Sequence, residues 1–230
     1  MSFIVTLIGR QSVLTGTYFP HIDLSGGNWS VGFIGFQTYN SIPNISSSNC
    51  YLHYDDNKRL SLPVGSYDLE DIGFYVKRHI PSISISANNN TLRTEIKTPE
   101  VRIDFTKESS IGKLLGFSSD RILEPSATAV YESDTPVQIF DVSTIRLDCN
   151  IATNSYQNGQ LVHTIHEFFP TVPSGYKIVE IPANILYLPV TVRTLDYLEI
   201  RVVDQDSRPI NFRGEEIAVR LHFRKDGSGS

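Results

Sequence analysis

The chain has 230 residues, a formal charge of −5, 20% charged residues and 40% apolar residues. A chain this long buries about 70% of its unfolded surface, so it can fold without disulfides or metal ions, and its apolar content argues against disorder. The mild acidity excludes the overall positive field by which nucleic-acid-binding proteins usually attract their ligand. No apolar run approaches the roughly 20 residues of a membrane-spanning helix. We therefore expect neither direct nucleic-acid binding nor a membrane span.

The N-terminus, the cysteines and the last residues indicate where the chain is made, the state of its thiols and the bounds of its domain. Residues 1–6 lack the basic region and long apolar run of a signal peptide, so we expect synthesis in the cytosol rather than secretion. Cys50 and Cys149 are interpreted as reduced, buried thiols. Residues 226–230, Asp-Gly-Ser-Gly-Ser, are typical of a flexible linker tail. We therefore assign a single domain to residues 1–225.

The first half of the chain predicts short strands and one clear helix. The helix is expected at residues 68–78, where apolar residues recur at helical spacing between an acidic first turn and a basic last turn. Residues 29–39 carry apolar groups on both faces, which predicts a central strand, and their two glycines indicate bends or close backbone approach. Residues 11–27 are predicted as a loop that ends at Gly26-Gly27. Further strands are predicted at 3–8, 51–54, 59–62, 82–86, 92–96 and 101–105.

The second half predicts one more short helix, at 109–117, and then mainly strands. A loop is expected at 118–136, strands at 137–147, 161–168 and 176–181, and a hairpin turn at Asn158-Gly159. Within 195–225, apolar and polar residues alternate in two strands joined by a turn-rich loop, and their apolar face needs an opposing sheet. About ten strands at a spacing of roughly 8–12 residues are typical of a sandwich. The predicted fold is all-β: a single jelly roll, or two-sheet antiparallel β-sandwich, with one or two short inserted helices.

Residue patterns for catalysis and metal binding are weak. His163 and His166 are the best metal candidates, but residues three apart on a strand point to opposite faces, so both cannot bind one ion without a bulge. Asp204 and Asp206, with Glu215 further on, offer oxygen ligands but lack the ordered spacing of a calcium loop and are interpreted as a turn. We expect no enzyme, no catalytic or cofactor-binding residue, no metal and no small-molecule substrate.

Three arginines, Arg201, Arg220 and Arg224, are candidates to line a basic sheet face. Acidic residues lie near them in the sequence. A solvated or subunit-facing surface is therefore the better interpretation than a nucleic-acid platform.

The C-terminal segment resembles a known family. Residues 197–206, 208–217 and 219–224 are similar to the C-terminus of the minor capsid (penton) proteins of Polinton/Maverick elements, adintoviruses and related virophages. Supporting similarity lies at 36–44, 63–67 and 111–117. The similarity thus touches most of the chain, and its most specific part is the C-terminal motif.

The resemblance implies a structural capsid protein. It implies a homopentamer at the five-fold vertices of an icosahedral shell built from double jelly-roll major capsid protein, with that protein as a partner and the virion as the location. In such a ring each protomer uses two different patches, a heterologous interface that closes after five steps. The long loops at 118–136 and 204–215 are candidate contacts. Arg208, Arg213 and Glu215 are the predicted subunit or capsid contacts, against the alternative of a solvated loop.

Three other functions remain open on the sequence. A jelly-roll binding module, such as a lectin-like or cytokine-like trimer, has the same fold but usually carries a secretion signal. A metal-dependent cupin-type enzyme conflicts with the spacing of His163 and His166. A copy of the penton protein retained by a host without a virion has the same sequence features.

Overall fold

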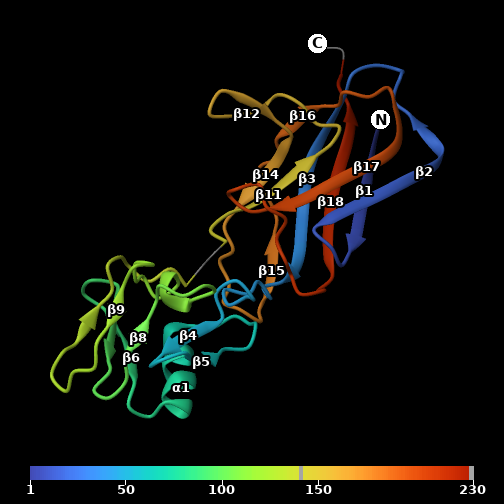
Figure 1. Cartoon of the computed structure of the whole chain (residues 1–230). Coiled ribbons are helices and arrows are strands. Elements are labelled where there is room, and N and C mark those ends of the chain that lie inside the picture. The colour runs from blue at the N-terminus through green and yellow to red at the C-terminus, as the bar shows by residue number, and fades with distance from the viewer. Residues whose placement is uncertain (140–141, 228–230) are drawn as a thin grey trace. The chain divides into compact units, whose positions relative to one another are not determined.

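The computed structural model describes residues 1–139 and 142–227 (Figure 1). Its contacts divide the chain into two compact units. The jelly-roll unit comprises Met1–Ile42 and Val142–Ser230, and the inserted unit comprises Pro43–Asp141. Each unit has its own cluster of buried apolar side chains. The sequence analysis assigned one domain to residues 1–225 and did not foresee this division; residues 228–230 of the linker tail lie outside the described residues.

Two antiparallel sheets form the jelly-roll unit, so the predicted all-β single jelly roll is confirmed (Figure 1). The first sheet has the order β1 (Ser2–Gly9), β18 (Ile217–Lys225), β3 (Trp29–Tyr39) and β15 (Lys177–Glu180), and β16 (Tyr187–Pro189) also pairs with β3. The second sheet has the order β14 (Thr164–Phe168), β11 (Ile145–Cys149), β17 (Thr194–Val203) and β2 (Val13–Asp23). A separate hairpin consists of β12 (Ser155–Gln157) and β13 (Gln160–Val162).

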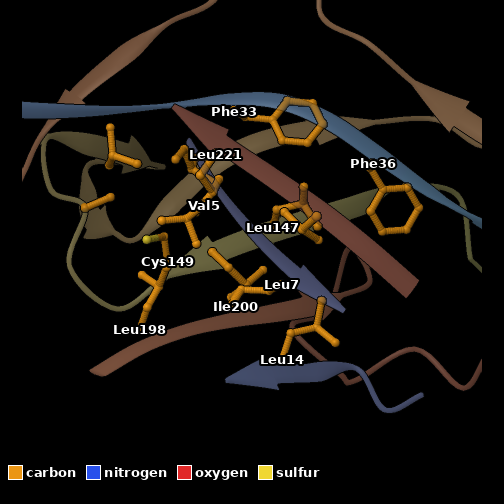
Figure 2. Close-up of a cluster of buried hydrophobic side chains, with 14 of the residues drawn as sticks. Val5, Leu7, Leu14, Phe33, Phe36, Leu147, Cys149, Leu198, Ile200 and Leu221 are labelled. Atoms are coloured by element: carbon orange, nitrogen blue, oxygen red, sulfur yellow. The ribbon is translucent and has the colours of Figure 1, made fainter. Parts of the chain in front are cut away.

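The core of this unit lies between the two sheets. Alternate side chains of β18 and β17 are fully buried, as their sequence pattern predicts. Figure 2 shows Val5, Leu221 and Phe33 of the first sheet gathered with Leu147 and Ile200 of the second. Each fully buried side chain of this size contributes about 1.5–3 kcal/mol. The two C-terminal strands lie in different sheets, so the loop at 204–216 connects one sheet to the other.

The predicted central strand is confirmed with its predicted bounds. β3 pairs with β18, β15 and β16, and all but three of its residues are buried. A Cβ at Gly32 would lie 2.5 Å from Ile185 Cγ2 and 3.0 Å from the ring of Tyr187. Glycine therefore lets this strand lie directly under the Tyr187 side chain.

The predicted loop at 11–27 is wrong, because residues 13–23 form β2. The strand lies at the end of the second sheet and pairs only with β17 within that sheet. β2 contains Pro20, which cannot donate to a sheet ladder. The pairing shifts register between Leu195 and Tyr197, opposite the segment that holds Pro20. An edge strand with such an irregularity tolerates proline.

The inserted unit has two small sheets and the α-helix. Helix α1 (Leu69–His79) begins at Asp68, whose side chain accepts from the Asp71 backbone N–H while the Asp71 side chain accepts from that of Asp68. The predicted helix and the predicted strands at 51–54, 59–62, 82–86 and 92–96 are confirmed to within about two residues, and the four strands pair as two hairpins. The sheets contain β5 (Lys58–Ser61), β4 (Tyr51–Tyr54), β8 (Ile103–Asp104) and β9 (Ile122–Leu123), and β10 (Tyr131–Glu132), β7 (Arg93–Lys97) and β6 (Ser84–Asn88).

Two predicted elements are shorter than expected. The helix at 109–117 reduces to one 3-10 turn, η1 (Ile111–Lys113), capped by the Ser110 hydroxyl. The strand at 137–147 reduces to β11, which starts at Ile145; residues 137–139 are not strand, and 140–141 lie outside the described residues. The two cysteines are free and buried, as predicted, with Cys50 in the inserted unit and Cys149 in the jelly-roll unit.

Candidate functional site

The loop at 204–216, which holds the three predicted contact residues, is firmly anchored. Ile210 and Phe212 are 3% and 2% exposed and belong to the jelly-roll core. Their carbonyl oxygens accept hydrogen bonds from the hydroxyls of Ser12 and Ser41. The loop therefore presents its polar side chains from a fixed backbone.

Arg208 is held by its own turn. Its Nε donates to Asp204 Oδ2 at 2.7 Å, and its Nη2 lies 3.1 Å from Asp206 Oδ2. Asp204 Oδ1 also accepts from the backbone N–H groups of Asp206 and Arg208. Burial raises the pKa of Asp204, but the hydrogen bonds from Arg208 and Asp206 outweigh it, so the pKa lies below its ordinary value. The Arg208 charge thus closes this turn while its side chain stays 56% exposed.

Unlike Arg208, Arg213 and Glu215 are not held by an ion pair within the loop. Arg213 is exposed at φ 55°, and its backbone N–H donates to Asn211 Oδ1. The backbone N–H of Glu215 donates to the Phe212 carbonyl. Neither side chain forms an ion pair with another described residue. The contact role of all three residues stays a prediction.

The carboxylates proposed as oxygen ligands face a cation of the chain itself. Asp204 and Asp206 both pair with Arg208, which is the geometry of a closed turn. Across residues 1–139 and 142–227, no group of three His, Cys, Asp or Glu residues is placed to hold a metal ion.

Of the two candidate histidines, His166 is on β14, and His163 lies between β13 and β14. The His166 ring stacks on Phe33 in the core at 4.2 Å, and its Nε2 is 3.0 Å from Glu180 Oε1. His163 Nδ1 lies 2.7 Å from the Ala152 carbonyl oxygen. The two rings therefore have different hydrogen-bond partners, the Ala152 carbonyl for His163 and Glu180 for His166.

The three arginines considered together in the sequence lie on two sheets. Arg220 and Arg224 are on β18 of the first sheet, and Arg201 is on β17 of the second. Arg224 lies over the ring of Tyr187, with its guanidinium carbon 3.6 Å from the centroid, and the Tyr187 hydroxyl is 2.7 Å from His222 Nδ1. The arrangement gives the outer face of the first sheet a packed cationic centre.

A cavity that the sequence analysis missed lies on the outer face of the second sheet. It measures about 490 Å³ and is here named the Arg146 cavity. Arg146 of β11 is only 5% exposed and is partly covered by the β12–β13 hairpin through Gln157. The sequence around Arg146 alternates like an ordinary strand, so no local signal indicated that its outward side chain is covered. The cavity is bounded mainly by Arg146, Asp148, Gln157, His163, Arg201 and Ser207.

The two-sheet fold of the chain has a counterpart among solved structures. The two sheets define a jelly roll, and comparison with solved structures finds the same fold in the selenomethionine-labelled crystal structure of the mavirus penton protein. The two chains are 10% identical with a TM-score of 0.52, and the match covers 98% of this chain and 100% of the penton chain. A likeness at this identity is a likeness of fold, and it agrees with the resemblance seen in the sequence. No protein-family model matches the chain, and no curated protein matches its sequence.

None of the helices in the described part of the chain is long and apolar enough to cross a membrane.

Proposed function

We propose that the chain is a capsid protein, a penton that occupies the five-fold vertices of an icosahedral shell. The observation that carries this proposal is the fold match to a penton protein, which runs over nearly the whole of both chains. The C-terminal motif at 197–224 supports it independently, because it was recognised from residues rather than from fold. The proposed assembly is a homopentamer, its partner a double jelly-roll major capsid protein, and its location the virion.

The two outer faces of the jelly roll support a head-to-tail ring, which needs two different patches on each protomer. On the first sheet, Ile4 and Ile8 of edge strand β1 point away from the core and are 55% and 61% exposed. On the second sheet, Phe19 of edge strand β2 is fully exposed. Edge strands can pair with another chain, and apolar residues that gather on them are candidates for an interface. Edge strands on two different sheets offer the unlike patches that a closed ring requires.

The proposed role is structural rather than catalytic. His163 and His166 have different hydrogen-bond partners, Ala152 and Glu180, and the Asp204 and Asp206 carboxylates are paired with Arg208. Burial raises the pKa of the Cys149 thiol to about 11, which disfavours the thiolate that a nucleophile needs. Each of these groups has a structural explanation.

The test is the mass of the purified protein in solution, measured by light scattering across a concentration series. A penton gives a species near five times the chain mass of 25.8 kDa. A species near three times the chain mass would instead favour the trimeric binding module and contradict the penton. A monomer at every concentration would direct the test to co-assembly with a double jelly-roll capsid protein, and failure to incorporate at its vertices would overturn the proposal.

A further inference from the structure

Arg146 carries a positive charge in a buried place and has no negative partner among the residues that the structure describes. Its side chain extends from the outer face of β11, and the residue is 5% exposed. Nη1 donates to Gln157 Oε1 at 2.7 Å, and Nη2 donates to Ser207 Oγ at 2.6 Å. Nε is buried and has no hydrogen-bond acceptor in the described part of the chain. Both acceptors are neutral, so neither balances the charge.

The nearby carboxylates are engaged elsewhere. Glu167 is the direct cross-strand neighbour of Arg146, yet no carboxylate of the described chain lies within 4.0 Å of its guanidinium. Asp148 Oδ1 accepts from the Thr164 hydroxyl at 2.7 Å, and Glu199 Oε2 accepts from the Tyr197 hydroxyl at 2.6 Å. A buried guanidinium without a counter-charge loses solvation that neutral hydrogen bonds only partly restore.

Arg146 and Ser207 both line the Arg146 cavity. Nε and Nη2 form one edge of the planar guanidinium group, and the Nη2 group of this edge donates to Ser207 Oγ. Ser207 is exposed and sits in a turn at φ 64°. Rotation of its hydroxyl opens an edge with two parallel donors, which is the arrangement that matches two oxygens of one carboxylate.

We propose that the Arg146 cavity binds a carboxylate through the Nε–Nη2 edge of Arg146. A single negative charge suits the site better than a phosphate dianion, because Asp148 and Glu199 also line the cavity and repel further negative charge. The cavity volume of about 490 Å³ has room for an acidic side chain or a small organic acid. The inference does not depend on the capsid role.

Two sources can supply this carboxylate, and they share the same chemistry. One is an Asp, Glu or terminal carboxylate of a second copy of this chain, in which case Arg146 contributes to assembly. The other is a free carboxylic acid, in which case Arg146 binds a small ligand independently of assembly. Both predict that acetate binds at Arg146.

The experiment is thermal unfolding of the full chain in sodium acetate against sodium chloride of equal ionic strength at pH 7. Acetate binding raises the melting temperature with concentration. Arg146→Met fills the same space without charge, and replacement of an unpaired buried charge by an apolar group is usually tolerated. Its acetate affinity falls by about tenfold or more. Arg220→Met, which removes an exposed arginine of the first sheet, keeps the acetate effect.

Ser207→Gly supplies the second variant, because glycine accepts the positive φ and removes the hydroxyl that competes for Nη2. We expect this variant to bind acetate as tightly as the unchanged chain or more tightly. An equal melting shift in chloride, or an acetate effect that survives in Arg146→Met, would overturn the proposal. Should Arg146→Met fail to fold, Arg146→Lys keeps the charge but lacks the planar edge, and full acetate affinity in that variant overturns the proposal equally.

Light scattering of the same samples separates the two sources. When a second copy supplies the carboxylate, acetate competes with it and lowers the mass, and Arg146→Met lowers the mass without acetate. When the source is a free acid, acetate raises the melting temperature and leaves the mass unchanged. Both outcomes support carboxylate binding at Arg146, whatever the test of the penton proposal shows.

Discussion

Asp204 and Arg208 hold each other across the turn where the chain passes from one sheet of the jelly roll to the other. Asp204 Oδ2 accepts from Arg208 Nε at 2.7 Å while Oδ1 accepts from the Arg208 backbone N–H at 2.9 Å. The aspartate side chain is 6% exposed. A buried carboxylate with this many donors fixes the direction in which the chain leaves β17.

Asp204→Asn should therefore destabilise the jelly-roll unit by about 1–3 kcal/mol at pH 7, because a buried acceptor loses its charge against an arginine. The pKa of Asp204 in the folded state lies below its ordinary value of 3.8. A depressed pKa contributes stability above the unfolded pKa, and this contribution disappears as the pH falls through the folded pKa. The difference between the two chains should thus be constant above about pH 5 and shrink below pH 4.

The measurement is urea unfolding followed by the fluorescence of Trp29, which is the single tryptophan and lies in the jelly-roll core. Asp206→Asn is the matched control, because that side chain is 62% exposed and its loss should change the free energy of unfolding by less than about 0.5 kcal/mol. Equal effects of the two substitutions would contradict the role given to Asp204.

Arg213→Ala and Glu215→Ala test the predicted subunit contacts. Neither side chain is in an ion pair within the described chain, so we expect each substitution to leave the free energy of unfolding within about 0.5 kcal/mol. If these side chains are subunit contacts, each substitution should lower the mass measured by light scattering toward that of the monomer. Arg208→Ala is a less clean test, because it also opens the Asp204 turn. Unchanged assembly in both exposed-residue variants would remove these residues from the interface.

The sequence predicted the strands whose patterns are local. β3 and β18 have long alternating or two-sided apolar runs, and the hairpin turn at Asn158-Gly159 is formed by residues that accept positive φ. β2 was missed because its pattern contains Gly16 and Pro20, and its strand conformation depends on pairing with β17. Local patterns also do not predict which strands share a sheet. β17 and β18 are consecutive in the chain, yet they lie in opposite sheets.

The candidate site was predictable only in part, for a related reason. The turn chemistry of Asp204 and Arg208 follows from residues close in sequence, and the sequence analysis interpreted the aspartates as a turn. The burial of Arg146 depends on Gln157 and Ser207, which reach it from 11 and 61 residues away. The division into two units depends likewise on which apolar residues cluster, and the chain between Pro43 and Asp141 shows no composition change at its ends.

Ile4→Thr and Ile8→Thr test whether the outer face of β1 is covered in an assembly. Threonine keeps the β-branched shape that a strand favours, so the fold should be retained. Loss of exposed apolar area from an interface should lower the mass at a given protein concentration. Val130→Thr, a similar change at an exposed site of the inserted unit, is the control and should not alter assembly through this face. A mass unaffected by both β1 changes would place the interface elsewhere.

Asp68→Ala tests whether the inserted unit unfolds on its own. The substitution removes one half of the capping box of α1 and should cost about 0.5–2 kcal/mol. Because α1 is the α-helix of the described chain and Trp29 lies in the other unit, circular dichroism at the helical band and tryptophan fluorescence report different units. We expect Asp68→Ala to move only the unfolding transition that circular dichroism detects. Coincident shifts in both signals would mean that the two units unfold as one.

Cys149 offers a chemical test of the jelly-roll core. Its side chain lies between the sheets at 0% exposure, and burial raises the pKa of its thiol to about 11 (Figure 2). Alkylation requires the thiolate, so at pH 8 the native protein should leave Cys149 unlabelled by iodoacetamide, as read by mass spectrometry of its peptide.

Urea should expose Cys149 to alkylation over the same range in which Trp29 fluorescence changes, because both residues belong to one core. Asp204→Asn should then move the labelling midpoint and the fluorescence midpoint together to lower urea, whereas Asp68→Ala should move neither. Rapid labelling of Cys149 in the native chain would show that the sheets separate locally without global unfolding, which the tight packing of this core argues against.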